Sequence, residues 1–406
     1  MKKILLIAFL FLLNSTHIFA QWEELRNINI GSNITCLAVS ENIIYAGTEK
    51  GLFISEDNGD NWKELITQDT IDMRVLSVAV KGDTIIIGTR SLGLFISFDN
   101  GSKWKNLHNM FDITIDIPIN AIVFDNSGSI YVGSENYEIS SSSNYGDSWD
   151  HKFYEKGYEV TAFICIGNNI IAGTNLGILF SKNGSSLDFY SRKRLDSIGI
   201  SSFAKNENNV FAGTDNGLYL AEDSGDNWTR VNIDFSDNIQ SMVLVNNNIF
   251  AISRSKGLFQ SIDFGENWKL VNQNLVSYIS FGSVRKWSIV IGYEYIFVSA
   301  DSRIFRAKLS DFGITNVQEK INEFNISLFP NPANNTFRLK YNSDVEKQAQ
   351  LSIYDYLGKE VLSLSEPCVA GANEKTVDCS RLSTGYYIVK VRCGAGVQTQ
   401  GLVILK

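Results

Sequence analysis

Short apolar runs with polar residues at alternate positions recur along most of the chain, separated by turns rich in Gly, Asn and Asp. In the first complete unit these runs occupy residues 35–39, 45–48 and 51–55, and a fourth begins at Trp62. Alternation with a period of two is typical of strands, and Gly and Asn suit tight turns between them. Four short strands in about 40 residues predict one blade of a β-propeller.

The number of blades follows from where the unit recurs. Units begin at Trp22, Trp62, Trp104, Trp149, Phe189, Trp228 and Trp268. The two ends complement each other, because the segment after Trp22 matches a fourth strand without its first three, whereas residues 296–306 match a second and third strand without a fourth. We therefore expect seven blades, with the Trp22 segment as the outer strand of the last blade. Such closure leaves no open sheet edge in the ring.

A turn motif, Ser-x-Asp-x-Gly-x-x-Trp, separates the third and fourth strands of most units. Its carboxylate can accept backbone N–H groups, its Gly permits a positive φ, and its Trp can pack under the hairpin. One copy in each blade favours a scaffold role over a catalytic or calcium-binding one. A worn copy near residues 181–183 lacks the Trp, and one full copy has Asn in the Asp position. The motif residues are Asp57, Gly59, Trp62, Asp99, Gly101, Trp104, Asn144, Gly146, Trp149, Asp223, Gly225, Trp228, Asp263, Gly265 and Trp268.

This motif resembles the Asp box, or BNR repeat, of sialidases, sortilin-type receptors, xyloglucanases and a photosystem assembly factor. The resemblance extends from Trp22 to about Leu309 and implies a seven-bladed propeller. The Arg-Ile-Pro motif of sialidases is absent, since Asn-Ile follows Arg26. The xyloglucanase resemblance implies two propellers with a cleft between them, whereas the repeats here account for one.

A second pattern begins after the repeats. Residues 313–323 are interpreted as a linker between a propeller over residues 21–312 and a domain over residues 324–406. Alternating apolar runs around Asp and Gly turns predict a small Ig-like β-sandwich for this domain. The whole chain is therefore predicted to be all-β.

Several features of this domain resemble the type A C-terminal sorting domain of the type IX secretion system of Bacteroidota. The resemblance rests on Pro330, Asn331, Pro332, Gly358 within a Tyr-Asp-x-x-Gly-Lys-x-Val stretch, Gly385, Tyr386, and a closing apolar strand that ends at Lys406. It implies recognition by that secretion machinery and passage through the outer membrane. Removal of the domain would then lead to release or to attachment to surface lipopolysaccharide. The alternative is a generic sandwich for adhesion or carbohydrate binding.

The net charge and the first twenty residues indicate which partners the protein has and where in the cell it is located. The formal net charge is -8 with no Lys/Arg-rich run, which argues against nucleic acid and anionic membranes as partners. Two lysines followed by an apolar run over residues 4–13 predict a secretory signal peptide over residues 1–20. No later segment is apolar enough to predict a transmembrane helix. We expect a protein exported through the periplasm and then secreted or held at the outer cell surface.

Cysteine usage argues against a metal site. The five cysteines leave at least one unpaired, and we expect Cys36 and Cys165 to be small buried core residues. The sequence leaves open whether two of Cys368, Cys379 and Cys393 form a disulfide. The sequence has no Cys-x-x-Cys or His-rich spacing, so we expect no metal and no cofactor.

Two functions remain open from the sequence. The first is a binding module for a glycan or a protein, and the alternative is a glycoside hydrolase with an unidentified carboxylate site. No catalytic residue is assigned. A site is expected on the loops that lead into the innermost strands, where acidic and aromatic side chains would suit sugars or a basic protein. The candidate binding residues are Asp69, Asp72, Arg74, Asp112, Asp116, Tyr154, Tyr158, Arg192, Arg194 and Tyr278.

Overall fold

The computed structural model describes residues 20–25, 32–40, 42–67, 73–107, 117–135, 138–153, 158–167, 169–181, 189–191, 195, 197–206, 209–222, 225–231, 237–272, 275, 286–314, 326–343, 347–355, 359–369, 371–393 and 396–406. These residues form antiparallel β-sheets, joined by turns and by short 3-10 turns such as η4 (Leu309–Phe312). The predicted all-β fold is confirmed.

The first 28 strands build seven four-stranded sheets, which we number as blades 1 to 7 in the chain order of their innermost strands. The innermost strands are β2 (Ile34–Ser40), β6 (Val75–Lys81), β10 (Ile119–Phe124), β14 (Val160–Ile166), β18 (Ile200–Lys205), β22 (Ile239–Val245) and β26 (Trp287–Ile291). The second strands are β3 (Ile43–Thr48), β7 (Thr84–Thr89), β11 (Ile130–Ser134), β15 (Asn169–Thr174), β19 (Val210–Thr214), β23 (Asn248–Ser253) and β27 (Tyr295–Ala300). The third strands are β4 (Gly51–Ser55), β8 (Leu94–Ser97), β12 (Glu138–Ser142), β16 (Gly177–Ser181), β20 (Gly217–Ala221), β24 (Gly257–Ser261) and β28 (Arg303–Lys308). The outer strands are β5 (Lys63–Thr67), β9 (Lys105–Asn106), β13 (Asp150–Phe153), β17 (Phe189–Ser191), β21 (Thr229–Arg230), β25 (Lys269–Leu270) and, in blade 7, β1 (Glu23–Glu24).

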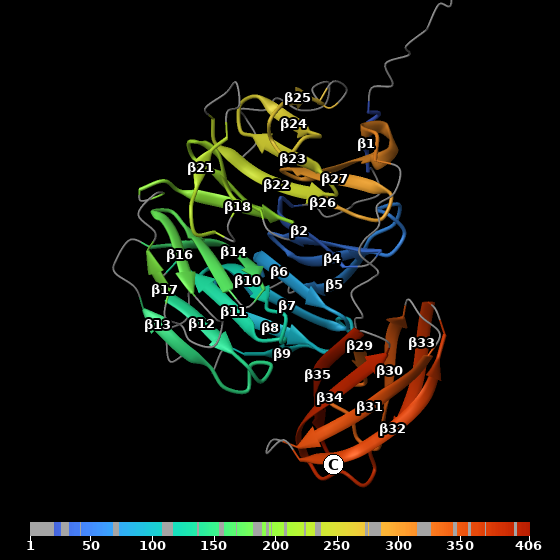
Figure 1. The fold of residues 1–406 in the computed structure, drawn as a ribbon. Helices are drawn as coiled ribbons and strands as arrows, with labels where there is room; N and C mark the ends of the chain where they lie inside the picture. Colours follow the sequence, from blue (N-terminus) through green and yellow to red (C-terminus); the bar gives the residue numbers. More distant parts are fainter. Residues whose placement is uncertain are drawn as a thin grey trace, which may run out of the picture.

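The seven sheets form a closed ring. Each innermost strand contacts the innermost strand of the next blade, and β26 of blade 7 contacts β2 of blade 1. In Figure 1 the blades follow one another in chain order, and blue β2 lies beside orange β26. The predicted number of seven blades is confirmed.

Glycine in the second strand allows neighbouring blades to approach closely. An ideal Cβ added to Gly133 of β11 would lie 2.3 Å from Val160 Cγ1, which begins β14 of the next blade. The glycines at the equivalent position of blades 1, 2, 4 and 5 meet the first residue of the following innermost strand in the same way. The recurrent Gly near the end of this strand is therefore a packing requirement between blades.

The innermost strands of blades 1 to 6 each carry a β-bulge near their start, where the register with the second strand shifts. Hydroxyl side chains in this region bond to the next blade. Thr161 Oγ1 donates to the carbonyl of Ile200 at 2.5 Å, and Ser77 Oγ donates to that of Ile119 at 2.8 Å. A bulge re-aims side chains, and here it turns them toward the neighbouring blade.

The seam of the ring is closed by the start of the chain, as predicted. Strand β1 pairs with β28, with Glu23 opposite Arg306 and Glu24 opposite Phe305. Trp22 is buried in the core of blades 6 and 7, and its Nε1 donates to the carbonyl of Val271 at 3.3 Å.

Arg306 ties the seam to blade 1. Its Nε lies 3.0 Å from the carboxylate of Glu23, and its Nη1 lies 2.8 Å from that of Asp60. The same Nη1 donates to the carbonyl of Asn58 at 2.7 Å. One guanidinium therefore joins β28, β1 and the turn after β4.

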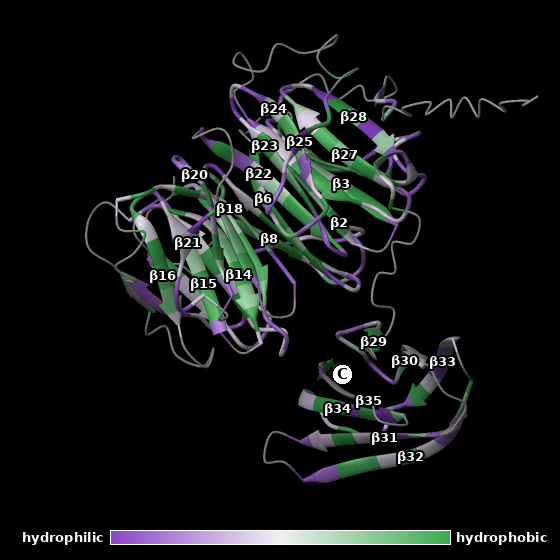
Figure 2. Ribbon diagram, turned by 45° about the horizontal axis from the view of Figure 1, so that its top comes forward, coloured by the Kyte–Doolittle hydropathy of each residue, from purple (hydrophilic) through white to green (hydrophobic). Residues whose placement is uncertain are grey.

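The remaining strands form a second domain with its own core. Strands β29 (Ile326–Phe329), β30 (Thr336–Ser343) and β33 (Gly371–Asp378) make one sheet, and β32 (Glu360–Cys368), β31 (Lys347–Asp355), β34 (Gly385–Cys393) and β35 (Gly396–Ile404) make the other. Buried residues from both sheets, among them Phe337 and Val389, form one apolar cluster. In Figure 2 hydrophobic and hydrophilic colours alternate along strands such as β32. The domain is a two-sheet sandwich, and its predicted likeness to immunoglobulin domains stays a prediction.

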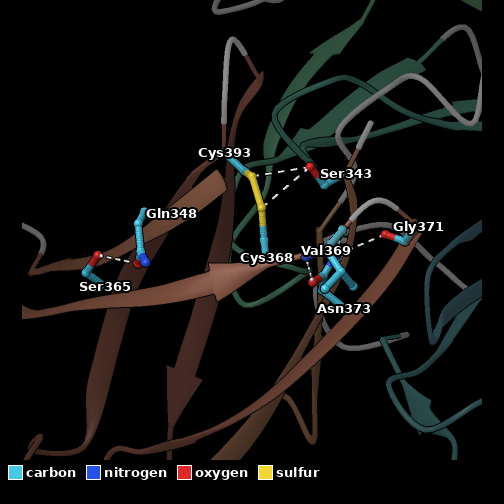
Figure 3. Close-up of a disulfide and its surroundings, with 8 residues drawn as sticks. All are labelled: Ser343, Gln348, Ser365, Cys368, Val369, Gly371, Asn373 and Cys393. Atoms are coloured by element: carbon cyan, nitrogen blue, oxygen red, sulfur yellow. Dashed lines mark hydrogen bonds between the residues drawn. A yellow bond between two sulfur atoms is a disulfide. The ribbon is translucent and has the colours of Figure 1, made fainter. Parts of the chain in front are cut away.

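A disulfide joins Cys368 at the end of β32 to Cys393 at the end of β34, two strands that flank β31 in one sheet. Figure 3 shows the bond beside Ser343 and next to the crossover from β32 to β33. Cys379 is a free, buried cysteine. Of the two cysteines predicted to be buried in the propeller, Cys165 is buried, whereas Cys36 is only half-buried, although both lie on innermost strands.

Candidate functional site

The antiparallel order of each blade divides the ring into two faces. We call the loop face the one that carries the hairpins between second and third strands and the connections that lead into the next innermost strand. The opposite face carries the hairpins between first and second strands and the turns that contain the repeated motif, and we call it the Asp-box face. Because successive strands run in opposite directions, these two sets of turns cannot share a face.

The carboxylates of the repeated motif are tied into their own turns on the Asp-box face. Asp57 Oδ1 accepts the backbone N–H of Asn61 at 2.8 Å and the hydroxyl of Ser55 at 2.9 Å. Equivalent backbone bonds are accepted by Asp99, Asn144 and Asp263. Asp223 lies outside the described residues.

The Gly and Trp of the motif complete the turn. Gly59 has a φ of 91°, and an added Cβ would lie 2.6 Å from Leu25 of the closing segment. Trp62 Nε1 donates to the Gly59 carbonyl at 3.0 Å. The same donor and acceptor recur at Trp228 and Trp268. These contacts support a scaffold role for the motif.

The pKa values of the motif carboxylates also support a scaffold role. Hydrogen bonds from the backbone and side chain of Asn61 lower the pKa of Asp57 below its ordinary value. Bonds from the side chain and backbone of Asn267 lower the pKa of Asp263 likewise. A glycosidase needs one carboxylic acid that stays protonated near neutral pH, so these two residues are unsuited to that role.

Arg74 belongs to a polar cluster on the loop face. It directly precedes β6, and its Nη2 lies 3.5 Å from the carboxylate of Glu49, in the hairpin between β3 and β4. Asn33 Nδ2 donates to the same carboxylate at 3.2 Å. Both side chains of the ion pair are about one-third exposed, at 30% and 32%, so a ligand can reach them.

Tyr158 lies two blades away from Arg74. It precedes β14, is half-buried and packs against the apolar cluster that contains Ile139 and Val160. The structure therefore places these two predicted residues in separate clusters. The other predicted loop residues lie outside the described part of the chain: Asp69, Asp72, Asp112, Asp116, Tyr154, Arg192, Arg194 and Tyr278.

Sequence reasoning missed a second polar cluster of the loop face, between blades 5 and 6. Asn238 donates to the carboxylate of Asp215 across the blade boundary. Asp237 Oδ2 accepts the backbone N–H of Ser255 at 2.9 Å, its hydroxyl at 2.7 Å, and the hydroxyl of Ser253. Burial opposes ionisation of Asp237, but these bonds and one from Asn238 outweigh it and lower its pKa. Comparison of the repeats could have found the cluster, because Asp215 directly follows the second strand of blade 5 as Glu49 directly follows the second strand of blade 1.

A third cluster lies in the outer half of blade 3. Glu138 Oε1 is 2.6 Å from His151 Nδ1, and Ser140 Oγ is 2.9 Å from the same nitrogen. A Ser–His–acid triad requires the acid and the nucleophile on opposite imidazole nitrogens. Ser140 is also only 1% exposed. The geometry therefore does not suit nucleophilic catalysis by Ser140.

In the second domain, the Pro-Asn-Pro stretch is bound to the last strand. Asn331 Nδ2 donates to the carbonyl of Gly401 at 2.8 Å, and Asn331 Oδ1 accepts the N–H of Val403 at 2.8 Å. Tyr386 covers Gly401, because an added Cβ there would lie 2.5 Å from the phenol oxygen. Lys406 donates its N–H to Thr384 Oγ1 at 3.0 Å.

Three other residues of the predicted sorting pattern are described by the structure. Pro330 and Pro332 flank Asn331, Gly385 begins β34, and Gly358 lies outside the described residues. Residues 327–405 match the protein family described as "Secretion system C-terminal sorting domain". The second domain is a type IX secretion sorting domain. The family match covers the sorting domain and not the ring, and no curated protein matches the chain.

Solved structures similar to the chain are β-propellers. PorZ of Porphyromonas gingivalis, a surface component of the type IX secretion system, is 13% identical with a TM-score of 0.55 over 92% of this chain and 60% of that protein. YCF48 from Cyanidioschyzon merolae is 15% identical with a TM-score of 0.55 over 71% of this chain and 98% of that one. The GH74 xyloglucanase from Xanthomonas campestris is 12% identical with a TM-score of 0.58 over 80% of this chain and 60% of that one.

These similarities show the fold alone. The chain spans 60% of the length of PorZ, and the similar structures include both an enzyme and proteins not described as enzymes. Among the residues that the structure describes, we find no helix with the length and apolar character needed to cross a membrane.

Proposed function

We propose that this protein is an exported binding module whose loop face recognises a glycan or a protein at the cell surface. The observation that carries the proposal is the contrast between the two faces of the ring. Motif carboxylates on the Asp-box face are engaged within their own turns, whereas the loop face presents polar clusters that differ from blade to blade. Polar side chains on divergent loops over a rigid scaffold are the usual arrangement of a recognition surface.

Export is supported by the sorting domain. A signal peptide over residues 1–20 would take the chain to the periplasm, and the sorting domain would present it to the type IX machinery. The boundaries that we propose are a propeller over residues 21–312, a linker over residues 313–323 and a sorting domain over residues 324–406.

A glycoside hydrolase is the second candidate. Its support is the propeller fold that the chain shares with a xyloglucanase. Hydrolysis with retention or inversion needs two carboxyl groups about 5–5.5 Å or about 6.5–9.5 Å apart, on either side of the scissile bond. We assign no such pair.

The test uses the purified full chain against immobilised polysaccharides and against surface proteins of a host cell. We expect saturable binding of one class, without release of reducing sugar. Arg74→Ala on the loop face should weaken that binding, while Lys103→Ala on the Asp-box face should leave it unchanged. Turnover of a polysaccharide, abolished by substitution of a loop-face carboxylate, would establish the hydrolase instead.

A further inference from the structure

One pair of residues recurs on the loop face of blades 1 to 6. In each of these blades, the residue that directly follows the second strand donates its backbone N–H to the carbonyl of the residue that directly precedes the innermost strand. The N···O distances lie between 2.9 and 3.2 Å. We call these two residues the loop-face pair of a blade. The pairs are Asn33 and Glu49, Arg74 and Arg90, Pro118 and Glu135, Glu159 and Asn175, Gly199 and Asp215, and Asn238 and Arg254.

Blade 2 departs from this series in its charge. The loop-face pairs of the other five blades each combine one charged residue with one uncharged residue, whereas blade 2 has two arginines. In blade 1 the uncharged partner satisfies the charged one, because Asn33 Nδ2 donates to the carboxylate of Glu49 at 3.2 Å. In blade 2 the partner has the same charge and cannot do so.

The two arginines stand opposite each other. They lie one step beyond Val75 and Thr89, which are partners in the ladder between β6 and β7. Opposite residues of an antiparallel pair have Cβ atoms about 4.5–5.5 Å apart, and like charges at such positions are destabilising. A protein retains an unfavourable local arrangement of this kind chiefly where it serves a function.

The guanidinium groups keep most of their N–H donors unused. Arg74 Nη2 lies 3.5 Å from the carboxylate of Glu49, and Arg74 Nε is buried with no hydrogen-bond partner. The side chain of Arg74 is nevertheless 30% exposed. Arg90 is exposed, and within the described part of the chain it belongs to no ion pair. Its backbone is held in place, since the preceding Thr89 accepts the N–H of Leu92 through Oγ1 at 2.9 Å.

We propose that Arg74 and Arg90 form a carboxylate-binding site for an acidic polysaccharide, an inference that rests on the proposed function and narrows its ligand to a glycan with uronate groups. One uronate carboxylate lies between the two guanidinium groups, whose planar forks match its two oxygens. Its negative charge removes the repulsion between the arginines. Glu49 is a positioning residue, because it holds Arg74 from the neighbouring blade.

The surroundings of the pair distinguish this ligand from other anions. Interfaces with proteins are anchored by aromatic and apolar side chains, yet no large hydrophobic residue is exposed among the described residues of blades 1 and 2. The formal net charge of -8 opposes a densely charged polymer such as nucleic acid, which carries a charge about every 1.7 Å. A polysaccharide separates its carboxylates by whole sugar rings, so one carboxylate can enter the site alone.

The first experiment is affinity electrophoresis of the full chain in gels that contain polygalacturonate, a neutral glucan or polyglutamate, each compared with a gel without polymer. We expect polygalacturonate alone to retard the protein. Arg90→Gln should weaken this binding at least about tenfold, because it removes charge-assisted hydrogen bonds. Arg254→Gln is the matched control, since Arg254 is an exposed arginine at the equivalent position of blade 6 with the uncharged partner Asn238. Equal weakening by both variants would reveal a general effect of net charge and overturn the site.

Two further measurements separate recognition from structure. Arg90→Gln should melt at or above the temperature of the wild-type protein, because it relieves the repulsion from Arg74. A lower melting temperature would show that a carboxylate of this chain holds Arg90, and the site would be wrong. Arg90→Lys keeps the charge but loses the planar fork, so it should bind polygalacturonate several-fold more weakly than the wild type. Wild-type affinity of that variant would overturn recognition by the fork.

The outcomes also separate this site from the proposed function. If a neutral glycan or a surface protein binds and Arg90→Gln leaves that binding unchanged, the proposed function stands and the carboxylate site is wrong. If polyglutamate binds through Arg90 and polygalacturonate does not, the site takes an acidic peptide and the glycan class is wrong. If no polysaccharide and no surface protein binds, the site and the proposed function both fall.

Discussion

Arg306 joins three parts of the seam of the ring, and its neighbours determine what its loss would cost. The arginine is 10% exposed, whereas its partners Glu23 and Asp60 are 62% and 59% exposed. Removing the guanidinium therefore returns both carboxylates to water and leaves no unpaired charge in the interior.

We expect Arg306→Met, which keeps the apolar stem, to lower the free energy of unfolding by about 1–2 kcal/mol and the melting temperature by a few degrees. Lys63→Met is the matched control, since Lys63 pairs with Glu56 at 2.8 Å but both side chains are 57% exposed. That variant should change stability by less than about 0.5 kcal/mol. Equal losses in calorimetry would show that the buried position of Arg306 adds nothing.

The hydrogen-bonded Asp237 carboxylate should make the stability of the ring depend on pH. Its pKa lies below the ordinary value of 3.8 because Ser253, Ser255 and Asn238 donate to it despite its burial. A group whose pKa is lowered by folding contributes stability above its unfolded pKa and loses that contribution as the pH falls through the folded pKa.

Asp237→Asn should therefore cost on the order of 1 kcal/mol at neutral pH, allowing for solvent screening at this half-exposed site. The difference from the wild type should shrink as the pH falls below about 3.8. Urea unfolding midpoints across that range measure it. Glu159→Gln serves as the control, because Glu159 bonds to Asn175 through its backbone N–H. A difference that is constant with pH would rule out the titrating carboxylate as its cause.

At the scale of the element, the strands were predictable but their distortions were not. The third run of the first unit, residues 51–55, is observed as β4 (Gly51–Ser55), because apolar alternation and flanking turns mark both of its ends. The bulges in the innermost strands were missed, since Thr161 reads as an ordinary strand residue and only its bond to the next blade reveals its place. Contacts between blades depend on ring closure, which no local pattern encodes.

Substitution of Gly133 tests the close packing between strand β11 of blade 3 and strand β14 of blade 4. An added Cβ would lie 2.3 Å from Val160 Cγ1 and 2.5 Å from its Cβ. Because the Cβ of Val160 is fixed by its backbone, the strand itself would have to shift to relieve the clash. Gly133→Ala should lower the unfolding free energy by about 1–3 kcal/mol. Val160→Ala removes Cγ1, the atom at 2.3 Å, but keeps the Cβ at 2.5 Å, so it relieves part of the clash. The double variant should therefore be less destabilised than the sum of the two single variants by about 1 kcal/mol. Simple additivity in denaturant unfolding would contradict the predicted clash.

At the scale of the whole molecule, the sequence located the ring closure and the sorting domain but not a site. The last unit lacks a fourth strand, and the regular repeat shows that this strand is missing. The segment after Trp22 has the pattern of that strand, so the sequence identifies it as the closing segment. The candidate loop residues share no sequence motif, and eight of the ten lie outside the described part of the chain. The polar cluster of Glu138, Ser140 and His151 in blade 3 went unnoticed because these residues do not stand out singly in the sequence. Only comparison with equivalent positions in the other blades shows that a carboxylate has replaced a glycine.

The two domains have separate apolar cores, which makes the role of the sorting domain testable by truncation. One core draws its buried residues from both sheets of the sandwich, including Phe337, and another from blades 6 and 7 with Trp22. Deleting residues 324–406 should therefore leave the ring folded while removing what the secretion machinery recognises. In a host with a type IX system, we expect the truncated chain to accumulate in the periplasm, and cell fractionation with immunoblotting measures this.

The control separates sorting from misfolding. The truncated protein, purified from the periplasm, should show the melting transition that the ring has in the full chain, because the closing strand β1 and its partner β28 are both retained. A lower transition would mean that retention reflects an unfolded ring and not a lost signal. Arrival of a folded, truncated protein at the cell surface would show that residues 1–323 carry a second export signal.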